Sequence, residues 1–526
     1  MIKQIHVFLF FCLAIFALLC ILSIRHLNLT YDEDCHYGYG QRILLHHPAH
    51  LEILDYTKMP FDAINVGCSQ AVTHFVILND PVKAGRYATI IAGMILAFYV
   101  FQWSYQLYGA VPALFSLFLF SFDPNIIAHS RLVTLDLYVA LMMTVSLYYF
   151  WRFLKLGGWK NGLISALVLG ISQSAKYTCL ALYPLCFLIG MVKYVESYCE
   201  FKRQRDYKSI RTLTIKLFAY GGMFIAVGIL MINVSFGFVR TGTLLKNYRF
   251  DGRLCRSLQS VTLFRECPIP LPYDYIRGID MVDLCQSKGD GYGNIYLLGH
   301  LKDKSKGDIK GFGGYYFFVY LFKTPLASQA IILLALFHYC FYRRWRFFMT
   351  DEIFLILPLL CLGVFINFFI NAQIGIRYIL FYFPLLYVFS GNLFVRWYKF
   401  KASVKAFFLV LLIYLAISTL SYFPHFISYF NEIVWDRKQA HKFLADSNLD
   451  WGGEQWYADQ YMKKHPETIF EPSKPMTGRI MVTVNELTGV NDSEKFKWLR
   501  ENYEPVEQVA HVYLIYNVKT INQNVK

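Results

Sequence analysis

The sequence predicts a polytopic α-helical membrane protein with a small α/β domain outside the membrane. Of its 526 residues, 56% are hydrophobic and only 17% are charged, whereas soluble globular chains carry about a quarter charged residues. Apolar stretches recur along the chain as far as residue 421, and residues 422–526 instead alternate strand-like and helical patterns. Lipid is therefore the expected solvent for much of the chain.

About eleven segments approach the roughly 20 mostly apolar residues that a spanning helix needs. The first reads HVFLFFCLAIFALLCILSI and resembles a signal peptide, but no small-residue cleavage site precedes TYDEDCHYG. We therefore expect an uncleaved anchor. The expected spans lie near residues 5–25, 86–106, 109–124, 134–151, 161–177, 178–192, 217–237, 314–341, 353–371, 378–395 and 406–421.

The distribution of Lys and Arg predicts the orientation of the chain. With a cytoplasmic N-terminus, four short inner loops hold 17 Lys and Arg against three acids, and basic residues favour the cytoplasmic side. The net charge of +15 then reflects topology, and no Arg/Gly-rich tail or zinc-finger spacing points to nucleic acid. The inner loops are 152–160, 193–216, 343–346 and 396–405.

Two domains follow from this orientation. Residues 1–421 form the transmembrane module, with outer loops 26–85 (loop and short helix) and 238–313 (irregular). Residues 422–526 form the extracytoplasmic domain, in which two strand-like runs, GRIMVTVNEL and VAHVYLIYNV, flank a helical SEKFKWLRENY after a helical WYADQYMKKH.

The twelve cysteines include no CxxC and no metal-ligand spacing, so a cysteine metal site is not expected. Five of them fall in outer segments, an odd number. A disulfide such as Cys255 to Cys267 and free thiols both remain open.

Four clusters of charged and polar residues fall at the ends of apolar segments on the predicted outer side. Charges at such positions are costly and are functional candidates by default. The clusters are Asp32, Glu33, Asp34 and His36 after the first span, His129, Arg131 and Asp136 in DPNIIAHSRLVTLD, Lys176 in SAKYT, and Arg377 in NAQIGIRY.

Converging carboxylates and cations suit the transfer of a group from a phosphate. A carboxylate takes the proton from an attacking hydroxyl, and cations stabilise the departing phosphate. Simpler explanations exist: the acids can be solvated, Arg131 and Asp136 can pair and cap a helix, and Lys176 and Arg377 can extend to lipid headgroups. Their occurrence on one side favours the functional interpretation.

The order of motifs resembles the GT-C type membrane glycosyltransferases, in particular the protein O-mannosyltransferase-like, phospholipid-carrier-dependent branch. The similar segments span nearly the whole chain. They are the DE pair after the first span, DPNIIAHSRLVTLD, LVLGISQSAKYTCLALYP, YFFVYLFKTPLA, IGIRYILFYFPLLYV, PHFISYFNE, LADSNLDWGGEQW, VTVNELTGV and KWLRENYEP. Three places depart from the family. A His-Pro-Pro-Leu element is replaced by YTKMPFDAI, with Lys58 as a new cation, the tail reads DWGGEQW where the family has D-W-G-Q, and the insert between the tail motif and the first strand is short.

The resemblance implies inverting transfer of a monosaccharide, such as a mannose-like hexose, from a polyprenyl-phosphate carrier to a hydroxyl of a protein, lipid or glycan. The reaction would occur at the outer face of a bacterial cytoplasmic membrane. Asp32 would be the general base and Glu33 a positioning or acceptor-binding residue, while Arg131, Lys176 and Arg377 would contact the donor phosphate. Supporting residues would be Asp136, which orients Arg131 or the donor, and His36, Lys58 and His129.

The tail motif contributes four further candidates, Asp446, Asn448, Asp450 and Trp451. We expect them to shape the acceptor side or, preferably, to pack the C-terminal domain on the membrane part. Asp32, Glu33, Asp34, His36 and His129 offer possible ligands for a divalent cation, but the cations already present suffice, so no metal and no other cofactor is expected.

Two other classes of protein remain as alternatives. A lipid-linked sugar transporter or flippase would predict inverted repeats and broken helices near the midplane, and the sequence has neither feature. A non-catalytic membrane scaffold would tolerate the loss of Asp32.

Overall fold

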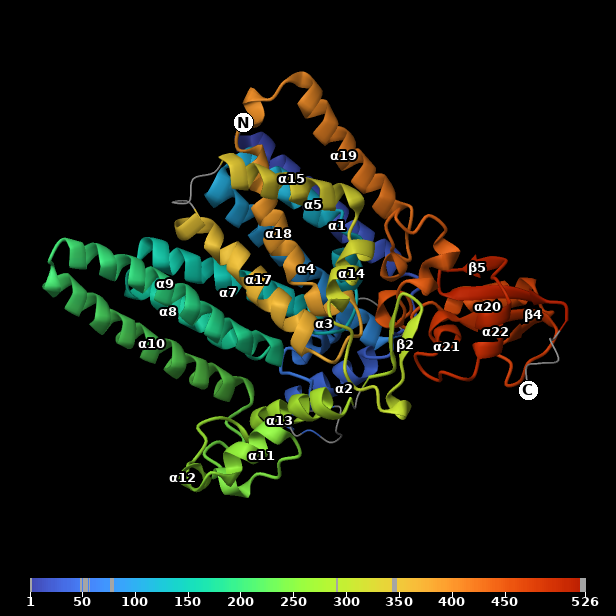
Figure 1. The fold of residues 1–526 in the computed structure, drawn as a ribbon, viewed down its shortest axis with the longest axis horizontal. Coiled ribbons are helices and arrows are strands. Elements are labelled where there is room, and N and C mark those ends of the chain that lie inside the picture. Colours follow the sequence, from blue (N-terminus) through green and yellow to red (C-terminus); the bar gives the residue numbers. More distant parts are fainter. Residues whose placement is uncertain are drawn as a thin grey trace.

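The computed structural model describes residues 2–47, 50, 55, 57–75, 80–289, 292–342 and 348–520. A large helical part is followed by a sheet-containing C-terminal domain that projects from one side of it (Figure 1).

Among the described residues, seven helices are long and apolar enough to cross a membrane, or eight if one bent pair forms a single span. This pair joins α14 (Tyr315–Lys323) and α15 (Leu326–Tyr342) at an angle of 114°. Pro325 lies at the break and has no backbone N–H to continue the helix. The seven are α1 (Ile2–Ser23), α4 (Pro81–Tyr108), α7 (Asp136–Leu156), α9 (Leu182–Arg203), α10 (Tyr207–Ser235), α17 (Ile353–Phe369) and α19 (Ala402–Leu420).

Three of the eleven expected spans form shorter helices. They are α5 (Ala110–Ser121), α8 (Trp159–Ser172) and α18 (Tyr382–Ser390), with 12, 14 and 9 residues. At 1.5 Å per residue these helices cover only about 14 to 21 Å of the roughly 30 Å hydrocarbon core. Apolar composition predicted burial at these positions but overestimated helix length. The chain is nevertheless an integral membrane protein, because the other spans carry the required length and composition.

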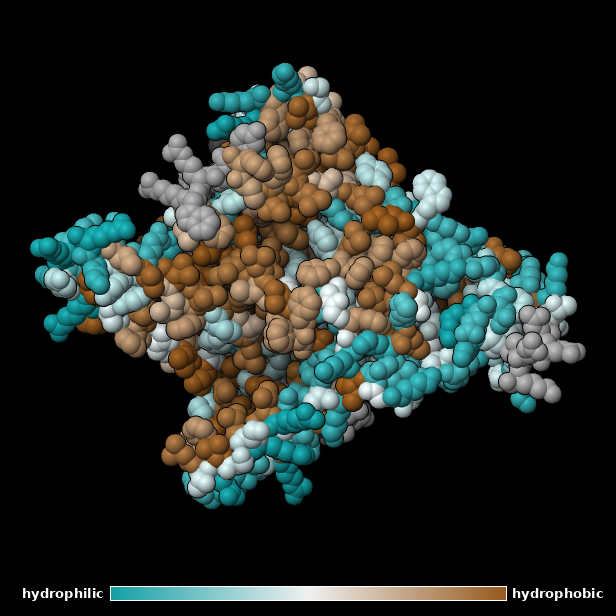
Figure 2. Space-filling view, viewed as in Figure 1, coloured by the Kyte–Doolittle hydropathy of each residue, from teal (hydrophilic) through white to brown (hydrophobic). Residues whose placement is uncertain are grey.

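The two groups of loops that were assigned to opposite sides of the membrane separate in space. The N-terminus and the start of α19 lie at the top of Figure 1, and the α9–α10 turn lies at the left. The segment α11–α13 lies at the bottom of the view, and the C-terminal domain lies at the right. Hydrophobic side chains dominate the surface between them, and hydrophilic ones gather at the extremities (Figure 2). The expected inner loop 343–346 lies outside the described residues.

The segments that were predicted to lie outside the membrane contain more regular structure than the sequence indicated. Residues 26–85 include α2 (Glu33–Leu44) and α3 (Asp62–Phe75). The segment 238–313 was expected to be irregular, but its described residues contain three α-helices and an antiparallel pair of strands. Its 16-residue helix α13 was missed because its buried residues include the charged Asp274, Arg277 and Asp280 beside Tyr275 and Met281, so no continuous apolar row marks it in the sequence. The elements are α11 (Arg253–Ser260), α12 (Thr262–Arg265), α13 (Tyr273–Lys288), β1 (Ile295–Leu297) and β2 (His300–Lys302).

The pair Cys255 and Cys267, considered for a disulfide, consists of free thiols. Cys255 is buried, whereas Cys267 is exposed.

The C-terminal domain contains a four-stranded sheet in the order β3-β4-β6-β5. Strands β3 and β4 are parallel, and the other pairs are antiparallel. The strands are β3 (Thr468–Phe470), β4 (Gly478–Thr483), β5 (Glu507–Val509) and β6 (Tyr513–Val518), and the helices are α20 (Gln455–Lys464), α21 (Val484–Thr488) and α22 (Lys497–Asn502).

Two details of this domain differ from the expectation. The second half of GRIMVTVNEL is helix α21 rather than strand. The run VAHVYLIYNV is divided between β5 and β6 by Ala510 and His511, whose φ angles of 53° and 61° turn the chain back on itself. Apolar alternation located the sheet but did not reveal these turns.

Candidate functional site

Four side chains from separate segments form a row of alternating charge, Asp32, Arg377, Asp136 and Lys176, which we call the charged row. Arg377 Nη1 donates to Asp32 Oδ2 at 2.6 Å and lies 4.0 Å from Asp136 Oδ2. Lys176 Nζ donates to Asp136 Oδ1 at 2.7 Å. Asp32 precedes α2, Asp136 begins α7, and the two cations lie in short connections between helices. The sequence separated these four residues, and the fold brings them together.

The two ends of the charged row are the more accessible members. The side chains of Asp32 and Lys176 are 34% and 26% exposed, against 4% for Asp136 and 11% for Arg377. Burial alone would raise the pKa of Asp32, but Arg377 beside it, with Lys58 and His36, brings this pKa below its usual value. Asp32 is therefore ionised at neutral pH and can accept a proton.

The tail motif holds Arg377 in place. The Trp451 ring lies 4.2 Å from the guanidinium carbon, and Asn448 Oδ1 accepts from the backbone N–H of Ile376 at 2.9 Å. Gly375 has a φ of 135°, and a Cβ atom there would lie 2.6 Å from Ser447 Oγ. A glycine is thus required for the tail to pack this closely against the loop that carries Arg377.

The same motif joins the C-terminal domain to the helical part. The carbonyl of Asn448 accepts from Lys323 Nζ at 2.5 Å, and its side chain donates to the Tyr315 hydroxyl at 2.9 Å. The carbonyl of Asp450 accepts from Asn485 Nδ2 at 3.0 Å, and the backbone N–H of Asp446 donates to Asn485 Oδ1 at 2.8 Å. Burial raises the pKa of Asp446 to about 6 and that of Asp450 to about 7.

Replacing Asp450 with Asn is expected to stabilise the protein in a pH-dependent way. Below the ordinary carboxyl pKa near 4, Asp450 is protonated in both states; between that value and about 7 only the unfolded chain releases the proton, so folding stability falls. Asn keeps an acceptor for the Gly452 N–H and does not titrate. Between pH 4.5 and 7.5, the unfolding free energy of the variant should rise relative to that of the natural protein by at least about 1 kcal/mol, equivalent to roughly one pKa unit. Thermal unfolding measures this difference. A difference that stays constant with pH would contradict this expectation.

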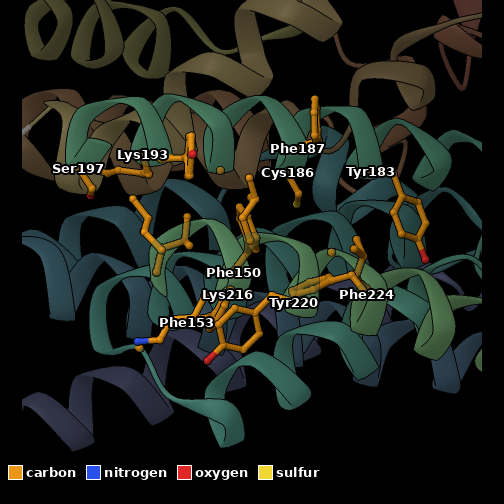
Figure 3. Close-up of a pocket in the computed structure, with 18 of the residues that line it drawn as sticks. Phe150, Phe153, Tyr183, Cys186, Phe187, Lys193, Ser197, Lys216, Tyr220 and Phe224 are labelled. Atoms are coloured by element: carbon orange, nitrogen blue, oxygen red, sulfur yellow. The ribbon is translucent and has the colours of Figure 1, made fainter. Parts of the chain in front are cut away.

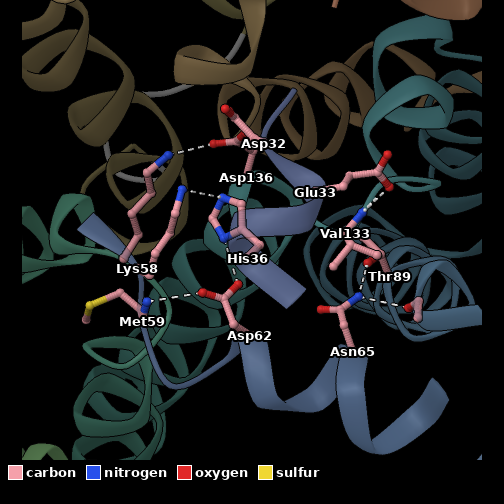
Figure 4. A network of polar contacts seen from close by, with 12 residues as sticks. Asp32, Glu33, His36, Lys58, Met59, Asp62, Asn65, Thr89, Val133 and Asp136 are labelled. Carbon is pink, nitrogen blue, oxygen red and sulfur yellow. Dashed lines mark hydrogen bonds and ion pairs between the residues drawn. The ribbon is translucent and has the colours of Figure 1, made fainter. Parts of the chain in front are cut away.

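A second polar group lies beside Asp32 (Figure 4). His36 Nδ1 lies 2.8 Å from Asp62 Oδ1, and Lys58 Nζ lies 3.5 Å from His36 Nε2. The backbone N–H of Met59 donates to Asp62 Oδ2 at 3.3 Å. Asp62 is fully buried and orients His36, yet the sequence did not single it out. The signal in the sequence that could have identified Asp62 was its position four residues after Lys58 in YTKMPFDAI.

Glu33 follows Asp32 directly but lies in a different environment. It is fully buried and accepts from Arg86 Nε and Nη2 at 2.8 and 2.7 Å. The backbone N–H groups of Thr30 and Val133 donate to it at 2.8 and 2.9 Å. Glu33 thus ties α2 to α4 and to the segment before α7. Arg86, which the sequence interpretation missed, was detectable as a charge at the start of an expected span.

Replacing Glu33 with Gln is expected to destabilise the protein by about 3–5 kcal/mol, because it leaves the buried Arg86 without its carboxylate. Glu504→Gln is the matched control, since its ion pair with Lys442 is 2.8 Å long but about half or more exposed. That control should change the unfolding free energy by less than about 0.5 kcal/mol. Thermal or denaturant unfolding in detergent distinguishes the two, and equal effects would contradict the assigned role of Glu33.

Arg131 and His129 lie deeper than the charged row. Arg131 is fully buried and donates from Nη1 to the carbonyl of Ser23 at 2.8 Å, and its Nε and Nη2 lack partners among the described residues. Burial lowers the pKa of Arg131 to about 10 and that of His129 to about 3. Asp136 forms ion pairs with Lys176 and Arg377. Among the described residues, it forms no ion pair with Arg131. The described residues also contain no group of three or more His, Cys, Asp or Glu arranged to hold a metal ion.

Known proteins provide an independent comparison. No curated protein matches the chain. ArnT from Cupriavidus metallidurans, solved bound to undecaprenyl phosphate, is 11% identical with a TM-score of 0.47, and the match covers 99% of both chains. The Archaeoglobus fulgidus oligosaccharyltransferase, solved with Zn and sulfate, is 13% identical with a TM-score of 0.44. That match covers 87% of this chain and 55% of the other, so this chain spans about half the length of the archaeal protein.

A family model described as dolichyl-phosphate-mannose-protein mannosyltransferase matches residues 71–199. The matched segment contains both the Asp136 motif and the Lys176 motif. In residues 71–199 the chain is therefore similar to the dolichyl-phosphate-mannose-protein mannosyltransferases, which confirms the resemblance to GT-C mannosyltransferases inferred from its motifs.

Proposed function

We propose that the protein is an integral membrane glycosyltransferase. It moves a monosaccharide, a mannose-like hexose or similar, from a polyprenyl-phosphate carrier to a hydroxyl of a protein, lipid or glycan. The reaction takes place at the outer face of a bacterial cytoplasmic membrane. The observation that carries this proposal is the charged row, in which an accessible carboxylate lies 2.6 Å from an arginine beside a second acid and a lysine.

Each member of the charged row has a role in a single displacement. Asp32 accepts the proton of the acceptor hydroxyl while the oxygen of that hydroxyl forms the new bond to the anomeric carbon of the sugar. The bond from that carbon to the carrier phosphate breaks, and the configuration at the anomeric carbon is inverted. Arg377 and Lys176 stabilise the negative charge that grows on the departing phosphate. Asp136 keeps both cations in position through its two carboxylate oxygens.

The contact between Asp32 and Arg377 also regulates the strength of the base. Without donor, Arg377 holds the pKa of Asp32 low and makes it a weak base. A donor phosphate competes for the same guanidinium, which weakens the pair and raises the pKa of Asp32. The base thus becomes stronger when the donor is bound.

The test is direct transfer by the purified protein in lipid bilayers. Labelled polyprenyl-phosphate sugars are supplied with candidate protein, lipid and glycan acceptors, and mass spectrometry identifies which molecule gains the label. We expect a product in which the sugar is linked to a hydroxyl, and we expect its formation to continue in the presence of EDTA. Activity that is lost with EDTA and restored by Mn²⁺ or Mg²⁺ would contradict the proposed absence of a metal. Movement of the labelled lipid across the bilayer without any labelled acceptor would indicate a transporter instead.

A further inference from the structure

A cavity of about 860 Å³ opens between α9 and α10, against α7 and α8. None of the residues of the charged row lines it. Its wall includes the aromatic side chains of Phe150, Phe153, Phe187, Tyr220 and Phe224 (Figure 3). Only 28% of the most apolar stretch of each of α9 and α10 is buried, so both helices face lipid. The cavity is accessible from the bilayer.

Glycines keep this cavity open. A Cβ atom at Gly221 would meet nothing within 4 Å, and one at Gly190 would meet only Phe150 Cζ, at 3.9 Å. Gly190 lies on α9 and Gly221 on α10, and both line the cavity. Larger side chains at these positions would fill the space between the two helices.

One end of the cavity is polar and cationic. Lys193, Ser197 and Lys216 lie at this end, while Tyr183 and Phe224 lie toward the other (Figure 3). Lys193 pairs with Glu196 at 2.7 Å, and Lys216 has no ion-pair partner among the described residues. Two lysines therefore face one acid, which leaves a positive charge at the mouth.

The dimensions match one leaflet of a membrane. Ten residues of α9 separate Tyr183 from Lys193, a rise of about 15 Å, and half of a hydrocarbon core is also about 15 Å. The cationic end is formed by Lys193 of α9 and Lys216 of α10. Both belong to the stretch 193–216, which its Lys and Arg assign to the cytoplasmic side. A carrier phosphate would have to reach the charged row, and none of the residues of that row lines this cavity.

We propose that this cavity binds an anionic glycerophospholipid of the inner leaflet. Its phosphate lies between Lys193 and Lys216, near the Ser197 hydroxyl, and an acyl chain runs along the aromatic wall toward Phe224. Because a basic residue at a membrane surface attracts an anionic lipid by about 1 kcal/mol, each lysine should contribute about fivefold to affinity.

Native mass spectrometry of the delipidated full-length protein tests this assignment. The protein is titrated with phosphatidylglycerol and with phosphatidylcholine of the same chain length. We expect one tightly retained phosphatidylglycerol, and about 25-fold weaker retention in the Lys193→Gln, Lys216→Gln double variant. Lys202→Gln, Lys208→Gln is the control, because these lysines lie on the same two helices, beside the α9–α10 turn, but do not line the cavity.

A steric pair of variants separates the cavity from general electrostatics. Gly221→Leu fills the cavity and should weaken retention of both lipids, whereas Gly222→Leu adds the same side chain outside the lining and should not. Melting temperatures verify that each variant is folded. Equal retention of the two lipids, equal loss in test and control variants, or retention of polyprenyl phosphate in preference to phosphatidylglycerol would each overturn the proposal.

Discussion

Replacement of Asp32 by Asn is expected to lower sugar transfer by about 10²- to 10⁴-fold, the range that a positioned general base contributes. Asn retains the shape of the side chain and an acceptor oxygen for Arg377, so the charged row should keep its arrangement. Initial rates with a labelled polyprenyl-phosphate sugar measure the loss, and thermal unfolding verifies that the variant is folded.

Asp34→Asn is the matched control for this experiment. Asp34 lies two residues further along α2 and is exposed, so its loss should change the rate by less than about twofold, as for other surface substitutions. Retained transfer in Asp32→Asn would contradict the role of Asp32 as the base. Absence of transfer in both the natural protein and the variant would instead favour a non-catalytic scaffold.

The competition between donor and Asp32 for Arg377 can be observed in the pH profile. The acid limb of kcat/KM reports the free enzyme, and that of kcat reports the enzyme with donor bound. Because Arg377 lowers the pKa of Asp32 in the free protein, the acid limb of kcat/KM should lie at lower pH than that of kcat. Coincident limbs would contradict the release of Asp32 by the donor phosphate.

Replacement of Arg377 by Gln is expected to lower transfer by about 10²- to 10³-fold, comparable to the loss of one donor that stabilises a transition-state anion. The change also leaves Asp32 and Asp136 with like charges and without the cation between them. Arg377→Lys keeps the charge but lacks the planar guanidinium that packs on the Trp451 ring, so it should recover only part of the activity.

The control for Arg377 is Arg437→Gln. Arg437 lies 3.9 Å from the Tyr422 ring, much as Arg377 lies 4.2 Å from Trp451, but it is remote from the charged row. Its loss should leave the transfer rate within about twofold. A similar loss in both variants would indicate that arginine–aromatic packing, rather than phosphate binding, accounts for the effect.

The sequence predicted the long spans well because bilayer thickness sets a length requirement that composition reveals directly. Helices α1, α4 and α10 follow that requirement. Composition could not distinguish a spanning helix from a shorter helix buried among others, so α5, α8 and α18 were expected to be longer than they are. Both kinds of helix are apolar, and only their packing separates them.

Charge at the ends of apolar segments identified Asp32, Asp136, Lys176 and Arg377 before their contacts were known. The sequence could not pair them, because 345 positions separate Asp32 from Arg377. It also treated the adjacent Asp32 and Glu33 as a unit. One step along α2 turns Glu33 into the core against Arg86 and leaves Asp32 toward Arg377.

The sequence by itself thus determined the membrane environment, the approximate spans and the residue types of the candidate site. The tertiary structure decided which charges meet. The physical reason is that hydrophobic length and charge placement are local properties of the chain, whereas an ion pair depends on the packing of several helices around it. Asp62 and Arg86, which support the site from within, became recognisable only through that packing.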